Sequence, residues 1–169
     1  MLLNGLKKGA GIAALAVLAA CASTPDEEEQ TVVPQAPVAV TPAGPAPGSM
    51  EDLKKNVGHR VFFGYNQYNL TNESQAILRR QAAWLQEYPG SRIRIEGNCD
   101  ERGTREYNLA LGARRANAAK AFLVGLGVDA GRIQVISNGK ENPVDPRSTP
   151  EAWSINRNAT TVLTTTVTS

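Results

Sequence analysis

The sequence has few of the side chains on which thiol and zinc chemistry depends. Its 169 residues include two cysteines, Cys21 and Cys99, and a single histidine, His59. A nucleophilic cysteine needs a base such as histidine within reach, and a zinc site takes three or four Cys, His or carboxylate ligands. His59 is far from Cys99 along the chain. These shortages argue against a thiol enzyme and against a zinc site.

Long apolar runs and basic stripes are also missing. After residue 20 no run of about 18 apolar residues occurs, which argues against a membrane-spanning helix in the mature chain. Lys7 and Lys8 belong to the N-terminal segment described below; without them the chain has 16 Lys and Arg residues and 16 Asp and Glu residues, so its charges balance. Aromatic residues make up only 5% of the sequence and do not alternate with basic ones, so nucleic acid is disfavoured as a partner.

The first twenty residues have the pattern of a secretory signal. Lys7 and Lys8 precede a short apolar run, 9–20, that is too short to span a bilayer. The run ends in LAAC, which resembles the lipobox of bacterial lipoproteins; the alternative is a plain signal peptide with an incidental cysteine. The resemblance implies that Cys21 becomes the mature N-terminus and carries a diacylglycerol thioether and an N-acyl chain, such as palmitate. No other cofactor is expected.

The lipid on Cys21 would anchor the chain to a membrane without spanning it. No aspartate follows Cys21 directly, and in the lipoproteins that aspartate retains a protein in the inner membrane. We therefore expect the cell outer membrane, with the folded domain in the periplasm.

Residues 21–50 are predicted to form a disordered tether. The stretch from Pro25 to Met50 contains six of the chain's 10 prolines, an acidic cluster and no aromatic residue, so it cannot bury enough apolar surface to fold. The remaining residues, 51–169, suffice for one domain with a single core.

Hydrophobic periodicity within 51–169 predicts an α+β fold. We expect strands over 60–65, 92–96, 132–137 and 159–168, a helix from an N-cap at Thr71 or Asn72 to Pro89, and a second helix from about 105 to 126. The order βαβαβ, an irregular segment and β predicts an α+β sandwich in which the helices pack on one face of a mixed four-stranded sheet, although the strand order is not determined.

The most charged segment is NCDERGTREYN, residues 98–108. Asp100, Glu101 and Glu106 could serve paired-carboxylate hydrolysis, but adjacent loop residues point apart. Neighbouring arginines would also lower the carboxyl pKa, whereas a general acid needs a raised pKa. Cys99 is expected to be sheltered beneath a strand end, with dimer formation through this thiol as the alternative.

Arg115 falls on the inward-facing stripe of the second helix, four residues after Leu111 and four before Ala119. A desolvated arginine needs an anion, and Asp100 is the natural candidate within the chain. Two interpretations remain open on spacing alone. The pair forms an internal salt bridge, or Arg115 and Asp100 receive the carboxylate and the ammonium of a zwitterionic ligand.

Several motifs in register resemble a known family. These motifs are DERGTREYN at 100–108, LG at 111–112 and RRA at 114–116. The sequence closely resembles the OmpA-like peptidoglycan-binding domain, and its motifs have the form found in the peptidoglycan-associated lipoproteins. VFFGY before these motifs, and SNGKENP and WSINR after them, match in order. The resemblance covers nearly all of 58–160.

The resemblance implies a non-catalytic domain that grips the diaminopimelate of the peptidoglycan stem peptide, with Asp100 and Arg115 on its amino and carboxyl ends. It also implies that five further residues line the groove: Tyr65, Asn66, Glu101, Thr104 and Leu111. The implied partners are peptidoglycan, TolB and other Tol-Pal components. Alanine at Asp100 or Arg115 is then expected to abolish most binding and leave the fold intact.

Departures from the family pattern limit this expectation. Asn66, Gln67 and Asn69 stand where aspartates and a lysine are common, Asn98 replaces a frequent histidine, and Asn158 stands where a second arginine follows Arg157. An amide gives a weaker bond than a carboxylate. Two alternatives therefore stay open: an enzyme acting on wall peptide, and a scaffold that binds mainly TolB with weak or no peptidoglycan binding.

Overall fold

The computed structural model describes residues 44–165. The predicted signal peptide, the lipidation site at Cys21 and most of the predicted tether lie outside the described residues, as does the threonine-rich end, 166–169. The described residues belong to one compact unit, 40–169. None of the helices within 44–165 combines the length and the hydropathy needed to cross a membrane.

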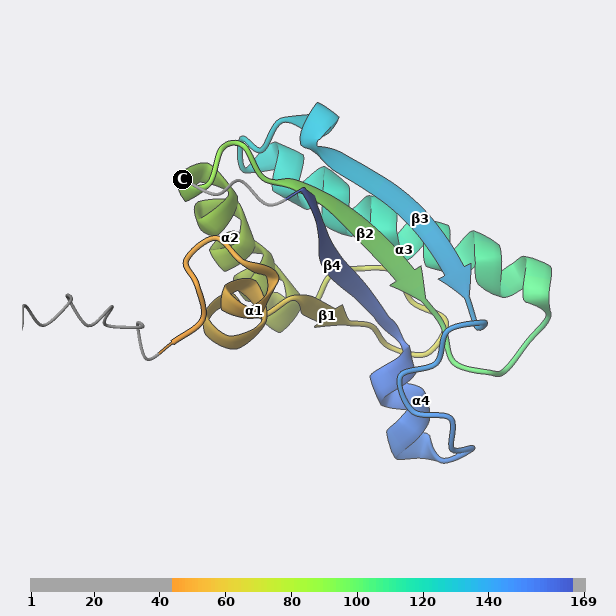
Figure 1. The fold of residues 1–169 in the computed structure, drawn as a ribbon. Helices are drawn as coiled ribbons and strands as arrows, with labels where there is room; N and C mark the ends of the chain where they lie inside the picture. Colours follow the sequence, from red (N-terminus) through yellow and green to blue (C-terminus); the bar gives the residue numbers. More distant parts are fainter. Residues whose placement is uncertain (1–43, 166–169) are drawn as a thin grey trace, which may run out of the picture. The chain divides into compact units, whose positions relative to one another are not determined.

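Four strands form one mixed sheet in the order β1-β4-β2-β3 (Figure 1). The strands are β1 (Arg60–Phe62), β2 (Arg92–Asn98), β3 (Ile133–Gly139) and β4 (Asn158–Thr165). β4 lies between β1 and β2 and is antiparallel to both, whereas β3 is parallel to β2. The predicted α+β class and the mixed four-stranded sheet are confirmed.

Two long helices, α2 (Asn72–Glu87) and α3 (Arg105–Gly125), cover the same face of the sheet (Figure 1). Thr71 caps α2 by accepting a hydrogen bond from the backbone N–H of Ser74, so the first of the two predicted N-caps is correct. Thr104 caps α3 through the N–H of Tyr107. The core between helices and sheet is mainly aliphatic and includes two buried aromatic side chains, Phe63 and Trp84.

Two glycines bring α3 unusually close to β2. A Cβ on Gly97 would lie 1.8 Å from the carbonyl oxygen of Gly112, and a Cβ on Gly112 would lie 2.7 Å from the carbonyl oxygen of Gly97. Real Cβ atoms do not approach backbone this closely, so the contact requires glycine on both elements. It sets the separation between the start of α3 and the end of β2, where the charged loop lies.

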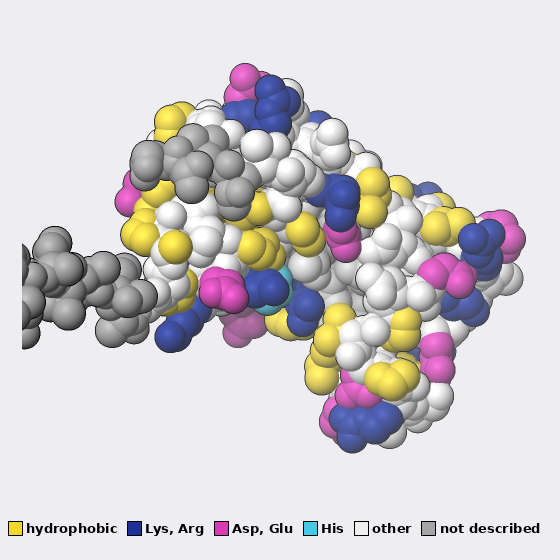
Figure 2. Space-filling model, in the orientation of Figure 1, with side chains coloured by type: hydrophobic (Ala, Val, Ile, Leu, Met, Phe, Trp, Pro, Cys, Tyr) yellow, Lys and Arg dark blue, Asp and Glu magenta, His cyan; other side chains and the backbone are white. Residues whose placement is uncertain are grey.

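The opposite face of the sheet is polar and is not covered by α2 or α3. Along β2 the buried Ile93 and Ile95 alternate with the more accessible Arg94 and Glu96, which form an ion pair of 2.7 Å. Figure 2 shows this face with hydrophobic side chains scattered among polar and charged ones.

Two short helices were not predicted. α1 (Met50–Asp52) is capped by Ser49 and continues into a π-helical turn, η1 (Leu53–Val57). α4 (Pro150–Asn156) replaces part of the predicted irregular segment. Thr149 caps this helix, and Pro150 occupies its first turn. A further 3-10 turn, η2 (Ala130–Arg132), precedes β3.

The carboxylate of Asp52 connects the segment that precedes α1 to α2 through hydrogen bonds. It accepts hydrogen bonds from the indole N–H of Trp84 at 2.8 Å, the backbone N–H of Gly48 at 3.0 Å and the side-chain amide of Asn56 at 2.7 Å. The folded arrangement therefore includes Gly48 and Ser49, which precede the boundary expected at residue 51.

Candidate functional site

A cavity of about 230 Å³ lies at the carboxyl end of β2, between the charged loop, the start of α3 and the loop after β1. Five of the seven predicted ligand-binding residues line it: Tyr65, Asn66, Asp100, Leu111 and Arg115. The other lining residues are Cys99, Arg102, Gly103, Tyr107 and Asn108.

Arg115 is fully buried, with 0% of its surface exposed, as its place on the inward stripe predicted. Its guanidinium donates to three backbone carbonyls: Nε to Gln67 at 2.8 Å, Nη1 to Asn98 at 2.8 Å and Nη2 to Gly64 at 3.1 Å. Burial lowers the pKa of Arg115, but a guanidinium keeps its charge in proteins. These bonds use three of the five N–H donors of a guanidinium, and two remain.

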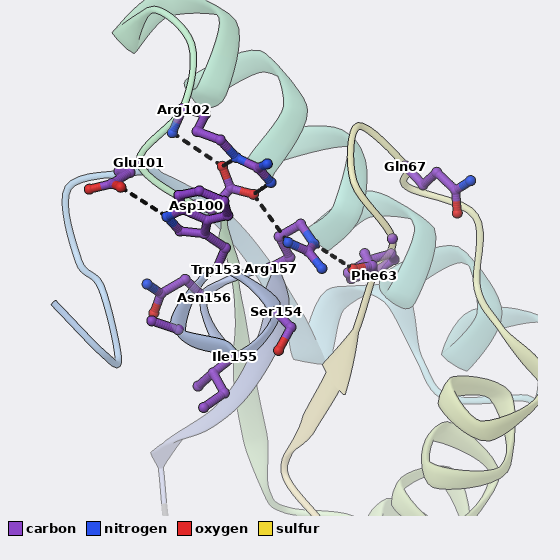
Figure 3. A network of polar contacts seen from close by, with 12 residues as sticks. Phe63, Gln67, Asp100, Glu101, Arg102, Trp153, Ser154, Ile155, Asn156 and Arg157 are labelled. Atoms are coloured by element: carbon purple, nitrogen blue, oxygen red, sulfur yellow. Dashed lines mark hydrogen bonds and ion pairs between the residues drawn. The ribbon is translucent and has the colours of Figure 1, made fainter. Parts of the chain in front are cut away.

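Asp100 does not form the expected ion pair with Arg115. Its carboxylate is paired instead with Arg102 at 2.7 Å and with Arg157 at 3.3 Å (Figure 3). The internal Arg115–Asp100 salt bridge is therefore wrong for this structure. Backbone carbonyls accept from three of the five donors of Arg115, and two other arginines pair with Asp100.

Four hydrogen bonds reach the Asp100 carboxylate. Arg102 donates its backbone N–H and its Nε to Oδ1, at 3.1 and 3.0 Å, and its Nη2 to Oδ2 at 2.7 Å. Arg157 donates Nη1 to Oδ2 at 3.3 Å. Burial alone would raise the pKa of Asp100, but these bonds and the charge of Arg102 hold it below its usual value. The carboxylate is therefore ionised at neutral pH and is unsuited to act as a general acid.

The guanidinium of Arg102 lies between two aromatic rings. It is 4.2 Å from the ring centre of Tyr65 and 4.2 Å from that of Trp153. Each distance is within the range of a cation–π interaction. Arg102 thus joins the charged loop, the loop after β1 and α4 at the mouth of the cavity.

Glu101 and Thr104, also predicted to line the groove, do not line the cavity. Glu101 accepts hydrogen bonds from the indole N–H of Trp153 at 2.8 Å and the hydroxyl of Ser148 at 2.9 Å, and so points away from Asp100 (Figure 3). Thr104 acts as the cap of α3. Both residues shape the loop and do not form the wall of the cavity.

Cys99 is buried and free, as expected for a sheltered thiol. Its Sγ contacts the carbonyl of Asn108 at 3.4 Å, and burial raises the pKa of the thiol. A protonated, enclosed thiol is a poor nucleophile.

Asn66 and Tyr107 contact each other across the mouth of the cavity, where the Tyr107 hydroxyl donates to the Asn66 side-chain carbonyl. Asn66 adopts a positive φ of 55°, a conformation that asparagine tolerates better than most residues. The amide that departs from the family pattern therefore has a local partner.

Two further departures, Asn98 and Asn158, belong to a chain of hydrogen-bonded amides across the polar face of the sheet. Asn158 accepts a hydrogen bond from the amide of Asn98 at 2.9 Å, and Asn98 accepts one from Asn138 at 3.1 Å. Asn158 is fully buried and also accepts from Thr160. These asparagines join β2, β3 and β4 and do not line the cavity.

Four residues at the site had no role assigned from the sequence: Arg102, Tyr107, Trp153 and Arg157. Trp153 and Arg157 belong to the last motif of the family resemblance, so the sequence carried a signal for them. Their partners on the charged loop could not be derived from spacing, because the two segments are far apart along the chain.

The family match and the curated relatives of this chain point to the same group of proteins. Residues 62–157 match the family described as the OmpA family. A peptidoglycan-associated lipoprotein of Agrobacterium fabrum is 52% identical over 117 residues, which cover 69% of this chain and 66% of that protein, just under two thirds of its length. One of Mesorhizobium japonicum is 45% identical over 153 residues, covering 90% of this chain and 88% of the relative.

Solved structures agree with the fold. The peptidoglycan-associated lipoprotein from Burkholderia pseudomallei superposes with a TM-score of 0.62 at 38% identity, over 66% of this chain and 99% of that one. The C-terminal domain of MotB from Helicobacter pylori superposes with a TM-score of 0.59 at 21% identity, over 63% of this chain and 84% of that one. The second likeness shows the fold alone.

Proposed function

This chain belongs to the OmpA family, within its peptidoglycan-associated lipoproteins, and from that premise we propose that its folded domain binds peptidoglycan non-covalently through the cavity at the end of β2. The family is structural, so the chain is not an enzyme. The lowered pKa of Asp100 agrees with this, because wall-peptide hydrolysis by paired carboxylates would need a raised one.

The proposed ligand is the zwitterionic end of diaminopimelate in the stem peptide. Asp100 would receive its ammonium and the two remaining donors of Arg115 its carboxylate, since a buried ionic site favours charge-assisted bonds of both signs. Tyr65, Asn66 and Leu111 would line the ligand, and Glu101 and Thr104 would hold the loop. The observation that carries the proposal is that one cavity is bordered by both Asp100 and Arg115.

We further propose that the lipid on Cys21 holds the chain at the outer membrane and that the tether spans toward the wall. The domain would then link the outer membrane to the wall within the Tol-Pal system, with TolB as a protein partner, and support envelope integrity and cell division. This part rests on the lipobox and on the family.

Sedimentation with purified peptidoglycan tests the wall-binding proposal. The chain from Ala22 onward retains Gly48 and Ser49, which the fold uses. It is expected to pellet with peptidoglycan and to release no soluble peptide. Asp100→Asn should weaken pelleting about tenfold or more, because it removes one charged end of the site at nearly constant shape.

A matched control lies on a neighbouring loop. Asp145 is paired with Arg147, two residues later, as Asp100 is paired with Arg102, yet Asp145 does not line the cavity. Asp145→Asn should pellet like the parent chain. Parent chain that stays in solution would overturn the proposal and favour a scaffold that binds mainly TolB. Soluble peptide would instead indicate an enzyme.

A further inference from the structure

All four acceptor positions of the Asp100 carboxylate are occupied. A carboxylate offers about four lone-pair sites, and Asp100 receives four hydrogen bonds, three from Arg102 and one from Arg157. Only 4% of the residue is exposed. An incoming ammonium finds no free acceptor there unless one of these donors leaves.

The two arginines differ in how firmly they are held. The side chain of Arg157 is 15% exposed and its Nε also donates to the carbonyl of Phe63 at 3.0 Å. The side chain of Arg102 is 34% exposed, and its guanidinium has Asp100 as its one hydrogen-bonding partner among the described residues. Arg102 is therefore the donor that can be exchanged, while Arg157 can keep Asp100 in place.

The two rings beside Arg102 offer the guanidinium a place to remain after release. Its stacking on Tyr65 and Trp153 does not depend on Asp100. Glu101, whose carboxylate already bonds Trp153, is another nearby negative charge that acts on Arg102. A small rotation of the guanidinium between the rings would uncover Asp100 without moving the loop.

We propose that Arg102 is a built-in substitute for the ligand ammonium, which must displace it from Asp100 for the site to be filled. This inference rests on the proposed function and deepens it. The exchange makes Arg102 a specificity-determining residue. A ligand that brings a cation to Asp100 replaces the bonds that it breaks, whereas a ligand with carboxylates alone gains only Arg115.

Calorimetric titration of the chain from Ala22 onward with two probes tests the exchange. meso-Diaminopimelate carries ammonium groups, and pimelate is the same dicarboxylic acid without them. In Arg102→Gln the competitor is removed, so meso-diaminopimelate should bind at least about fivefold more tightly. Pimelate should bind no more tightly, because the uncovered Asp100 charge repels it. Arg147→Gln, which removes the equivalent arginine beside Asp145, should match the parent with both probes.

Weaker binding of both probes by Arg102→Gln would show that Arg102 is itself a ligand contact and would overturn the exchange. Parent binding of meso-diaminopimelate with no tightening in Arg102→Gln would overturn the exchange and leave the proposed function standing. If neither parent nor variant binds meso-diaminopimelate, the exchange fails together with the proposed diaminopimelate ligand, and the pelleting assay alone decides whether the domain binds peptidoglycan.

A second measurement does not require the variant to fold. In the parent chain, NMR of the Arg102 Nε–H reports directly on its bond to Asp100. Saturation with meso-diaminopimelate should shift this signal and speed its exchange with water, and pimelate should leave it unchanged. The indole N–H of Trp153, one of two tryptophans in the chain, should shift with it. An unperturbed Arg102 signal in the diaminopimelate complex would overturn the proposal by itself.

Discussion

Arg115 has a structural task as well as its proposed ligand-binding one. Its three bonds fix the carbonyls of Gly64 and Gln67 in the loop after β1 and that of Asn98 at the end of β2. These carbonyls belong to two segments that are far apart along the chain. Loss of the guanidinium would leave several buried acceptors without a donor, and each such acceptor costs about 1–3 kcal/mol.

We therefore expect Arg115→Ala to destabilise the fold by about 3 kcal/mol or more, in contrast to the expectation from sequence that the fold stays intact. Urea unfolding of the chain from Ala22 onward measures the loss. The neighbouring Arg114 is exposed and supplies the control, because Arg114→Ala should stay within about 1 kcal/mol of the parent. A change below about 1 kcal/mol in Arg115→Ala would contradict the structural role.

The close contact between α3 and β2 lies beside the cavity and sets the distance between these two elements there. Gly97 and Gly112 let the two backbones approach, and Leu111 and Arg115 on the same helix then reach the cavity. A methyl group on either glycine has backbone or a strand side chain in its way, so the helix would have to move away from the sheet.

Gly97→Ala should destabilise the fold by at least about 3 kcal/mol, because the new methyl group meets backbone and not a flexible side chain. Gly125, at the end of α3, has open space beside it: apart from its chain neighbours and the nearby backbone of its own helix, no atom lies within 4 Å of the position of an added methyl group. Gly125→Ala should therefore be neutral or stabilising by up to about 1 kcal/mol. Thermal unfolding followed by circular dichroism compares the two. Equal melting temperatures would show that the close approach is not needed.

Local signals in the sequence predicted the main elements well. Thr71, the alternation of Ile93 and Ile95 and the stripe through Leu111 and Arg115 all follow from backbone periodicity and capping, which act over a few residues. α4 was missed although Thr149 and Pro150 are a start signal, because its few residues carry no apolar period.

The partners at the site were harder to predict than the elements. Burial of Arg115 was predicted correctly, but the internal salt bridge with Asp100, one of the two interpretations left open, was wrong. Backbone carbonyls from separate segments accept from Arg115 instead, and such acceptors leave no trace in the residue pattern. The same holds for Arg102, whose two aromatic neighbours come from opposite ends of the domain's sequence. Chemistry that depends on long-range contacts needs the fold.

The single histidine of the chain, His59, makes the stability of the fold depend on pH near neutrality. Burial, followed by the charges of Arg60 and Lys54, lowers the pKa of His59 below its usual 6.5. Below that value an unfolded chain takes up a proton more readily than the folded one, so acid shifts the equilibrium toward unfolding.

The free energy of unfolding should therefore be highest above about pH 6.5 and should fall as the pH drops through the lowered pKa of His59. His59→Asn should flatten the profile between about pH 5 and 7. Urea unfolding at a series of pH values, with parent and variant side by side, gives the comparison. If the free energy of unfolding changes with pH equally in the two chains, His59 is not the source of the pH dependence.

The contacts of Asp52 also determine how the domain receives tension. A pull along the chain before Gly48 reaches the Asp52 turn first and passes through the indole of Trp84 into α2. No residue that lines the cavity takes part in these bonds. If residues 21–50 form the proposed tether, mechanical strain from it would be received by the hydrophobic core and would bypass the bonds around Asp100 and Arg115.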